Sequence, residues 1–386
     1  MEYKTIGTVK LNIKNVYSIV IALLPVIMCF KVPVLNIGFS TLLICLFAPI
    51  SIRHIRIGHN SYIKLAIIIT FGYFFVRSYR SPFNMLLIGL VLLHIIGACN
   101  ESINLELMRK TIEWIGFVFA FFVFAQTLLY YVFGVRSSLL LEQFLLDENK
   151  YYVAKHVSNS GLYRPSAFFL EPAHYSEYCC IALLSILFPS NGRKADLKKA
   201  IVVAAGCLLT TSGIGMALSV GLFGAYAVFA QRKKGTRIRY IILWILIGVA
   251  ALAVLSRIPL FQTMFMRITG KVDGYNAIWG RTLNWDRYIG SMPPESKLLG
   301  YGYSSLPEGY MTGLMLVLYC FGYVGAALLL LVLLMYVIKG RNGFTVFLAI
   351  MYCSLMSVAN LFGLISLTFW FVLLTSSISS GVTEHG

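Results

Sequence analysis

The chain has 386 residues, of which 59% are hydrophobic and only 12% are charged, and its mean hydropathy is +0.80. An ordinary soluble domain carries roughly twice that charged fraction, so the composition excludes a soluble two-domain protein and indicates one polytopic, all-α membrane domain over residues 1–386. The net charge of +17 does not call for a nucleic-acid partner, because cytoplasmic loops beside anionic lipid carry such an excess.

The N-terminal segment MEYKTIGTVKLNIKN precedes the first apolar run and has the basic character of a signal peptide. No small-residue cleavage pattern follows it, so we expect an uncleaved first helix. The eight cysteines lie in or at the ends of apolar segments, and none forms a CxxC pair. The sequence therefore predicts neither a disulfide framework nor a metal site.

Apolar windows that predict membrane helices follow one another along the chain. They cover residues 16–30, 32–50, 62–76, 83–99, 112–134, 172–189, 200–230, 240–255, 311–338, 344–359 and 361–379. The window 200–230 is too long for one crossing of about 17–25 residues. Because TTSGIG at 210–215 places two glycines near its middle, we expect two short helices there.

The distribution of basic residues supports this division, because cytoplasmic loops gather Lys and Arg. With about twelve spans and both termini in the cytoplasm, the inner side receives Lys4, Lys10, Lys14, Arg53, Arg56, Lys64, Arg109, Lys110, Arg193, Lys194, Lys198, Lys199, Arg232, Lys233, Lys234, Arg237, Arg239, Lys339 and Arg341. Without the division of window 200–230 into two helices, the basic segment 231–239 would lie on the outer side of the membrane. Two long outer segments remain, about 135–171 and 256–310, and their basic residues suit an anion such as a phosphate.

The first outer segment ends in GLYRPSAFFLEPAHYSEYCC, where Arg164, Glu171, His174 and Glu177 crowd the start of a span. Pro172 suits the first helical turn, with Glu171 beside the cap. Glu171, His174 and Tyr178 then share one helix face, at the end where the helix dipole attracts an anion. This arrangement suits proton transfer beside a bound phosphate.

A purely structural interpretation of these residues is the alternative. In it, Glu171 caps the helix, Arg164 pairs with Glu171, and His174 lies in a polar pocket. Glu177 is harder to explain in this way. It lies about one and a half turns into the span, so it faces protein or a water-filled cavity, and carboxylates within membranes are functional candidates.

The second outer segment mixes aromatic residues with Arg281, Asp286 and Arg287. The aromatic residues are Tyr275, Trp279, Trp285, Tyr288, Tyr301, Tyr303 and Tyr310. Aromatic faces beside hydrogen-bonding side chains suit sugar rings, whereas the alternative is an interfacial aromatic belt. The arginine pair is less easily explained by a belt.

Three motifs together resemble a known family. R-P-S-A-F-F-x-E-P stands at the mouth of a span, T-T-S-G-x-G lies between two short spans, and W-G-R-x-x-x-W precedes L-G-Y-G-Y before the next span. From about residue 160 to 340, the chain resembles the bacterial O-antigen and capsule polymerases of the Wzy type, which are related to the O-antigen ligases.

The resemblance implies a GT-C-type glycosyltransferase in the bacterial plasma (inner) membrane. It would join oligosaccharide units carried on undecaprenyl pyrophosphate, at the outer face and without a cofactor or metal. Arg164 and Arg281 match arginines expected to hold pyrophosphate, and Glu171 matches the acidic residue of the E-P pair, whereas Gly213 stands where the family has an arginine. A chain-length regulator is the protein partner that such a polymerase can have.

The chemistry assigns roles to the same residues. Arginine forks stabilise a pyrophosphate leaving group, and an acceptor hydroxyl needs a base. We favour His174, whose unperturbed pKa lies near neutrality, over Glu171, Glu177 and His156. We expect the remaining outer side chains to bind substrate; these are Glu177, Tyr178, Trp279, Arg287, Tyr301 and Tyr303.

Three other functions compete with the polymerase. An O-antigen ligase would share the fold, the lipid carrier and the arginines, but would use lipid A-core as acceptor. A flippase or transporter of polyprenyl-linked oligosaccharide should show two similar halves with broken helices at mid-membrane, whereas this chain concentrates its polar residues in outer loops. A structural subunit would tolerate the loss of Arg164 and Arg281.

Overall fold

The computed structural model describes residues 12–32, 37–55, 62–146, 150, 163–189, 193–229, 256–268, 285–303 and 311–340, with single positions between 242 and 254 and at 370. Within these residues the regular structure is helical, and the strand-type pairings are isolated bridges such as that of Phe30 with Leu145. The expected windows 344–359 and 361–379, apart from Trp370, and most of 240–255 lie outside the described residues.

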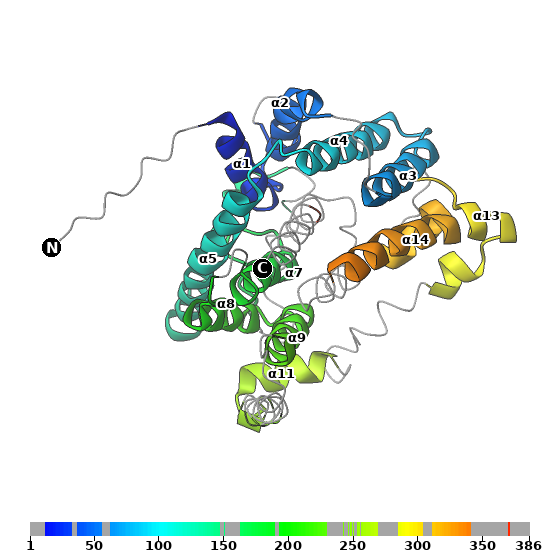
Figure 1. The fold of residues 1–386 in the computed structure, drawn as a ribbon. Coiled ribbons are helices and arrows are strands. Elements are labelled where there is room, and N and C mark those ends of the chain that lie inside the picture. The colour runs from blue at the N-terminus through cyan, green and yellow to red at the C-terminus, as the bar shows by residue number, and fades with distance from the viewer. Residues whose placement is uncertain are drawn as a thin grey trace.

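The helices follow the expected windows closely (Figure 1). They are α1 (Ile13–Ile27), α2 (Phe39–Arg53), α3 (Tyr62–Arg77), α4 (Pro82–Cys99), α5 (Leu105–Phe133), α7 (Pro172–Leu187), α8 (Leu197–Leu209), α9 (Gly213–Phe229), α11 (Pro259–Ile268), α13 (Pro294–Leu299) and α14 (Gly313–Gly340). The predicted division within 200–230 is confirmed, because α8 ends before Thr210 and α9 begins at Gly213.

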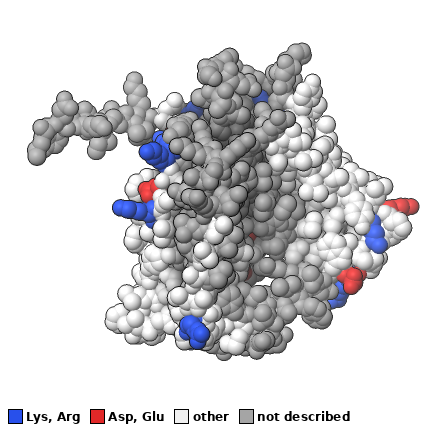
Figure 2. All heavy atoms as spheres, turned by 60° about the horizontal axis from the view of Figure 1, so that its bottom comes forward, with Lys and Arg blue, Asp and Glu red and all other residues white. Residues whose placement is uncertain are grey.

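Three helices of the described chain are long and apolar enough to cross a membrane: Pro82–Cys99, Leu105–Phe133 and the Gly313–Ile338 part of α14. Shorter apolar helices accompany them, at Ile13–Ile27, Phe39–Arg53 and Gly213–Ala227. Figure 2 shows a surface whose described part is mostly uncharged, with charged side chains in a few groups near its edge. These features support a helical membrane protein, and the number of spans stays a prediction.

The ends of the helices meet in two sets. At one end, Lys64 Nζ donates to the Asn100 side chain at 2.8 Å, and the Asn104 amide donates to Ser18 Oγ at 2.7 Å. We call this end, where the expected cytoplasmic basic residues of α1, α3 and α5 lie, the inner end. Successive helices from α1 to α5 therefore run in alternating directions.

The opposite end gathers the segments that we expect outside the membrane. The Lys31 amide donates to the Phe144 carbonyl at 2.7 Å, which joins the α1–α2 turn to the first outer segment. The guanidinium of Arg77, at the end of α3, donates to the Gly300 carbonyl, and Asn84 Nδ2 donates to the Tyr303 carbonyl at 3.4 Å. Both outer segments are thus attached to helix ends on one side of the molecule, which we call the outer end.

Helix α7 lies among α1, α5, α8 and α9 (Figure 1) and is buried from Tyr175 to Leu187. Close packing depends on two glycines. A Cβ at Gly206 of α8 would lie 2.5 Å from Tyr175 Oη, and one at Gly215 of α9 would lie 2.5 Å from Ser176 Oγ. Small residues of this kind let helix backbones approach closely in membranes, so α8 and α9 hold the first turns of α7 on two sides.

A break in α14 attaches the second outer segment to the bundle. Gly322 has φ +64° inside this helix, in the left-handed region that favours glycine. The break releases helix carbonyls, so Tyr319 O accepts from the Tyr301 amide and Cys320 O accepts from the Gly302 amide, both at 2.8 Å. The L-G-Y-G-Y segment is therefore fixed by backbone bonds to α14.

Candidate functional site

Helix α7 begins at the residue that the sequence predicted. Pro172 is the first helical residue, and Glu171 occupies the N-cap position with an extended backbone, φ −134° and ψ 149°. Its side chain accepts no capping hydrogen bond. Glu171 therefore occupies the cap position of the structural interpretation without capping the helix through its carboxylate, and the pairing of Arg164 with Glu171 stays a prediction.

His174 follows one turn later and is partly exposed. Its Nδ1 atom is buried and has no hydrogen-bond partner among the described residues. An imidazole one turn after a carboxylate, at the outer end of the bundle, supplies the residue types of a general base and the acid that orients it.

Glu177 and Tyr178 lie deeper in α7, and both are fully enclosed. The Tyr178 hydroxyl donates to the Ala22 carbonyl of α1 at 2.8 Å, and its ring packs against Phe169. Tyr178 therefore ties two helices together. Glu177 places a carboxylate inside the bundle, where an ionisable group is expensive and therefore a functional candidate.

The segment before α7 is held by the C-terminal part of α5. Tyr163 stacks on Tyr130 with centroids 4.6 Å apart and donates to the Ser137 carbonyl at 2.7 Å; burial raises the pKa of Tyr163 to about 12. The Ala167 amide donates to the Gln126 side chain at 2.9 Å. Arg164 lies between these two attachments and is partly buried, so its position at the mouth of α7 is fixed by α5.

The turn between α8 and α9 reaches the same place. Thr210 Oγ1 lies 3.0 Å from Ser176 Oγ of α7 and is fully buried. Thr211 has φ +53°, and Ala167, in the segment before α7, has φ +49°. A residue other than glycine in this left-handed backbone region costs about 1–3 kcal/mol, and such residues are frequent at functional sites. We call Arg164, Glu171, His174, Glu177 and Thr210 the outer site.

Thr210 was missed as a site residue. The T-T-S-G motif carried the signal, since it divides the long apolar window and belongs to the family resemblance, but neither observation gave Thr210 a role. Its place against α7 follows from the Ser176 contact, which no spacing in the sequence reveals.

The predicted residues of the second outer segment form a separate group on α14. Arg287 is exposed and lies over the Tyr288 ring, 5.7 Å from its centroid. Tyr301 is 37% exposed and packs against the Tyr319 ring, whereas Tyr303 stacks on Phe321, and burial raises the pKa of Tyr303 to about 12.

The two groups lie in different parts of the molecule. Figure 1 shows α13 at the edge beyond α14, whereas α7 lies on the other side of α14. Arg281, Trp279 and His156 fall outside the described residues. The structure thus places Glu171, His174, Glu177 and Tyr178 at the cap or in the first two turns of α7, with Arg164 in the segment before it. The link to the second arginine stays a prediction.

No protein-family model, curated protein or solved structure matches this chain.

Proposed function

We propose that this chain is a membrane glycosyltransferase that polymerises undecaprenyl-pyrophosphate-linked oligosaccharide units at the outer face of a bacterial plasma membrane, with about twelve spans and cytoplasmic termini. The observation that carries the proposal is the outer site. It combines a guanidinium, two carboxylates and an imidazole at the start of a buried helix, at the end where both outer segments are attached.

Each group has a role in the proposed transfer. His174 takes the proton of an acceptor sugar hydroxyl, and Glu171 stabilises the imidazolium that forms. The hydroxyl oxygen bonds to the anomeric carbon as the bond from that carbon to pyrophosphate breaks. Arg164, with Arg281, stabilises the charge that the leaving pyrophosphate gains.

Substrate contacts complete the proposal. We assign Glu177 to the substrate side of the site, and Trp279, Arg287, Tyr301 and Tyr303 to binding of the glycan at the second outer segment. Tyr178 has no part in it, because its hydroxyl already donates to Ala22 inside the bundle. The growing chain and the incoming unit therefore need a site that spans α7 and α14.

Arg164→Gln is the test, with Arg136→Gln as its matched control. Both arginines lie in the first outer segment, but Arg136 is exposed whereas Arg164 is partly buried at the start of α7. In cells whose only gene copy carries Arg164→Gln, we expect the gel ladder of surface polysaccharide to collapse to a single repeat unit. The control should keep long chains, and both variants should reach the membrane at the wild-type level.

Three results would redirect the proposal. Long chains in the Arg164→Gln strain would remove this arginine from the chemistry. Loss of all sugar from the acceptor would favour the ligase or the flippase. The purified protein distinguishes these last two, because with lipid A-core as acceptor only a ligase releases undecaprenyl pyrophosphate from the lipid-linked unit.

A further inference from the structure

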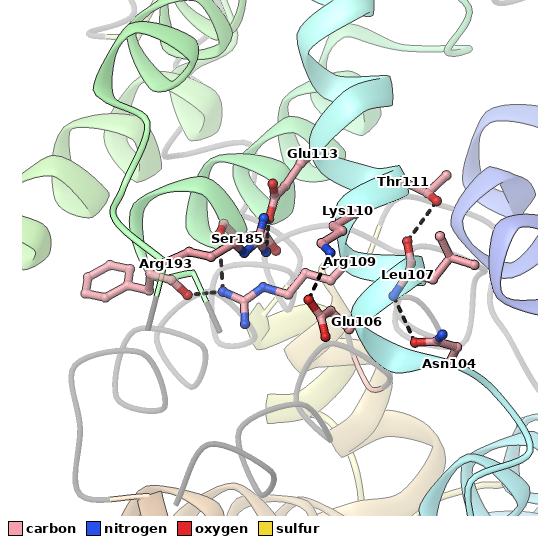
Figure 3. A network of polar contacts seen from close by, with 10 residues as sticks. Asn104, Glu106, Leu107, Arg109, Lys110, Thr111, Glu113, Ser185 and Arg193 are labelled. Carbon is pink, nitrogen blue, oxygen red and sulfur yellow. Dashed lines mark hydrogen bonds and ion pairs between the residues drawn. The ribbon is translucent and has the colours of Figure 1, made fainter. Parts of the chain in front are cut away.

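A second polar cluster lies at the inner end of α7, opposite the outer site (Figure 3). Arg109 of α5 is 3% exposed, and its guanidinium donates to the carbonyls of Ser185, at 3.2 Å, and Phe188. These carbonyls belong to the last turn of α7, where the helix leaves acceptors unsatisfied and its dipole favours a cation. Arg109 therefore fixes the inner ends of α5 and α7 together.

A cavity of about 330 Å³ opens beside this contact, between α5, the end of α7 and the start of α8. We call it the inner pocket, and its lining includes Glu113, Trp114, Arg193, Lys194, Asp196 and Lys199. Its volume lies at the lower end of the range of about 300–1,000 Å³ that is typical of small-ligand sites.

The pocket has an excess of positive charge, and its carboxylates are already engaged. Arg193 Nη2 lies 3.7 Å from Glu113 Oε1, and Asp196 caps α8 by accepting from the Lys199 amide at 3.1 Å. Lys194 is exposed and forms no ion pair with a described residue. The Lys199 ammonium lies 4.3 Å from the centre of the Trp114 ring. A phosphate entering the pocket would thus meet cations that the carboxylates do not neutralise.

An apolar surface continues from the pocket along α5. Trp114, Val118 and Phe121 are 61%, 42% and 53% exposed and follow one another on one face of the helix. They run toward the middle of the longest apolar helix of the described chain. A ligand that matches both the inner pocket and the apolar surface along α5 has an anionic head group and an apolar chain.

We propose that the inner pocket binds the phosphate head group of an anionic glycerophospholipid, whose acyl chain lies along Trp114, Val118 and Phe121. Basic pockets between membrane helices on the cytoplasmic side recognise such head groups, and Trp is frequent at the level of the head groups. The proposal does not rest on the glycosyltransferase function, because the pocket lies at the other end of α7.

Trp114 supplies the readout for a test on the purified full chain in a neutral detergent. Phosphatidylglycerol with brominated acyl chains is titrated in, and tryptophan fluorescence is compared between the wild type and Trp114→Phe. We expect saturable quenching that Trp114→Phe removes. Brominated phosphatidylcholine should give no saturable phase, because its head group carries no net charge.

Lys194→Gln and Lys198→Gln form a matched pair, since both lysines are exposed near the start of α8 but only Lys194 lines the pocket. Lys194→Gln should weaken the apparent affinity for phosphatidylglycerol about fivefold, as expected for one basic residue near a head group. Lys198→Gln should change it less than about twofold.

Three outcomes would overturn the proposal. Equal effects of the two lysine variants would show diffuse surface charge rather than a pocket. Equal quenching by phosphatidylcholine would show ordinary lipid contact with α5. A saturable response of Trp114 fluorescence to inorganic phosphate, with none to the brominated lipid, would show a site for the free ion.

Discussion

Gly215→Ala should loosen the contact between α9 and α7 on which the outer site depends. The new Cβ would lie 2.5 Å from Ser176 Oγ and 2.6 Å from Ser176 Cβ. Rotation can move the hydroxyl away, but the Cβ moves only with the backbone of α7. Overpacking of this kind costs about 1–3 kcal/mol, and alanine regains at most about 1 kcal/mol of helix propensity.

Gly224→Ala on the same helix provides the control, because a Cβ there meets nothing within 4 Å. It gains the helix propensity without the steric cost, so its free energy of unfolding should rise by up to about 1 kcal/mol. The difference between the two variants then measures the overpacking alone. We expect Gly215→Ala to be the less stable by about 1–3 kcal/mol.

Thermal unfolding in detergent, followed by tryptophan fluorescence, gives the first measurement. Alkylation of Cys207 gives the second, since this thiol is fully buried beside α7 and reacts when α8 or α9 moves away. Gly215→Ala should melt at a lower temperature and expose Cys207 sooner than Gly224→Ala. Equal melting temperatures and equal alkylation rates would refute the close approach of Gly215 to Ser176.

Two further predictions test buried polar groups. Tyr178→Phe should lower the free energy of unfolding by about 1 kcal/mol, through loss of the bond to Ala22, and leave polysaccharide length unchanged in the gel ladder; shortened chains would return Tyr178 to the substrate site. Arg109→Gln should lower the free energy of unfolding by about 1–3 kcal/mol, because it leaves carbonyls of α7 unsatisfied. Lys110→Gln removes only a surface ion pair with Glu106 and should lower it by about 0.5 kcal/mol or less. Comparable melting temperatures of these two variants would contradict the capping role of Arg109.

The sequence predicted those features that depend on local composition. Pro172 begins α7 because proline suits a first helical turn. The break at 210–212 followed from the length of the apolar window and from the side on which segment 231–239 had to lie. The first inference uses only the backbone geometry of proline, and the second uses only the width of a bilayer and the charge of its two faces.

Features that depend on contacts between distant segments were not predictable. Arg109 was expected in a cytoplasmic loop, yet α5 begins at Leu105 and the residue is buried. Its long side chain reaches the end of a helix that begins more than sixty residues later in the sequence, and hydropathy cannot show this pairing. The backbone bond of Tyr301 to the break in α14 also joins distant segments, so the sequence did not predict it.

The direction of α7 connects the two polar clusters. Its N-terminus lies at the outer end, where the helix dipole is positive and Arg164 adds a further charge, so an anion is favoured there. Its C-terminus lies at the inner end, where Arg109 compensates the negative end of the dipole. A helix that ran in the opposite direction would present the negative end of its dipole to an anion at the outer end. Its N-terminus at the inner end would offer no free carbonyl groups to the guanidinium of a buried arginine. The placement of Arg109 therefore supports an arrangement in which α7 runs antiparallel to α5.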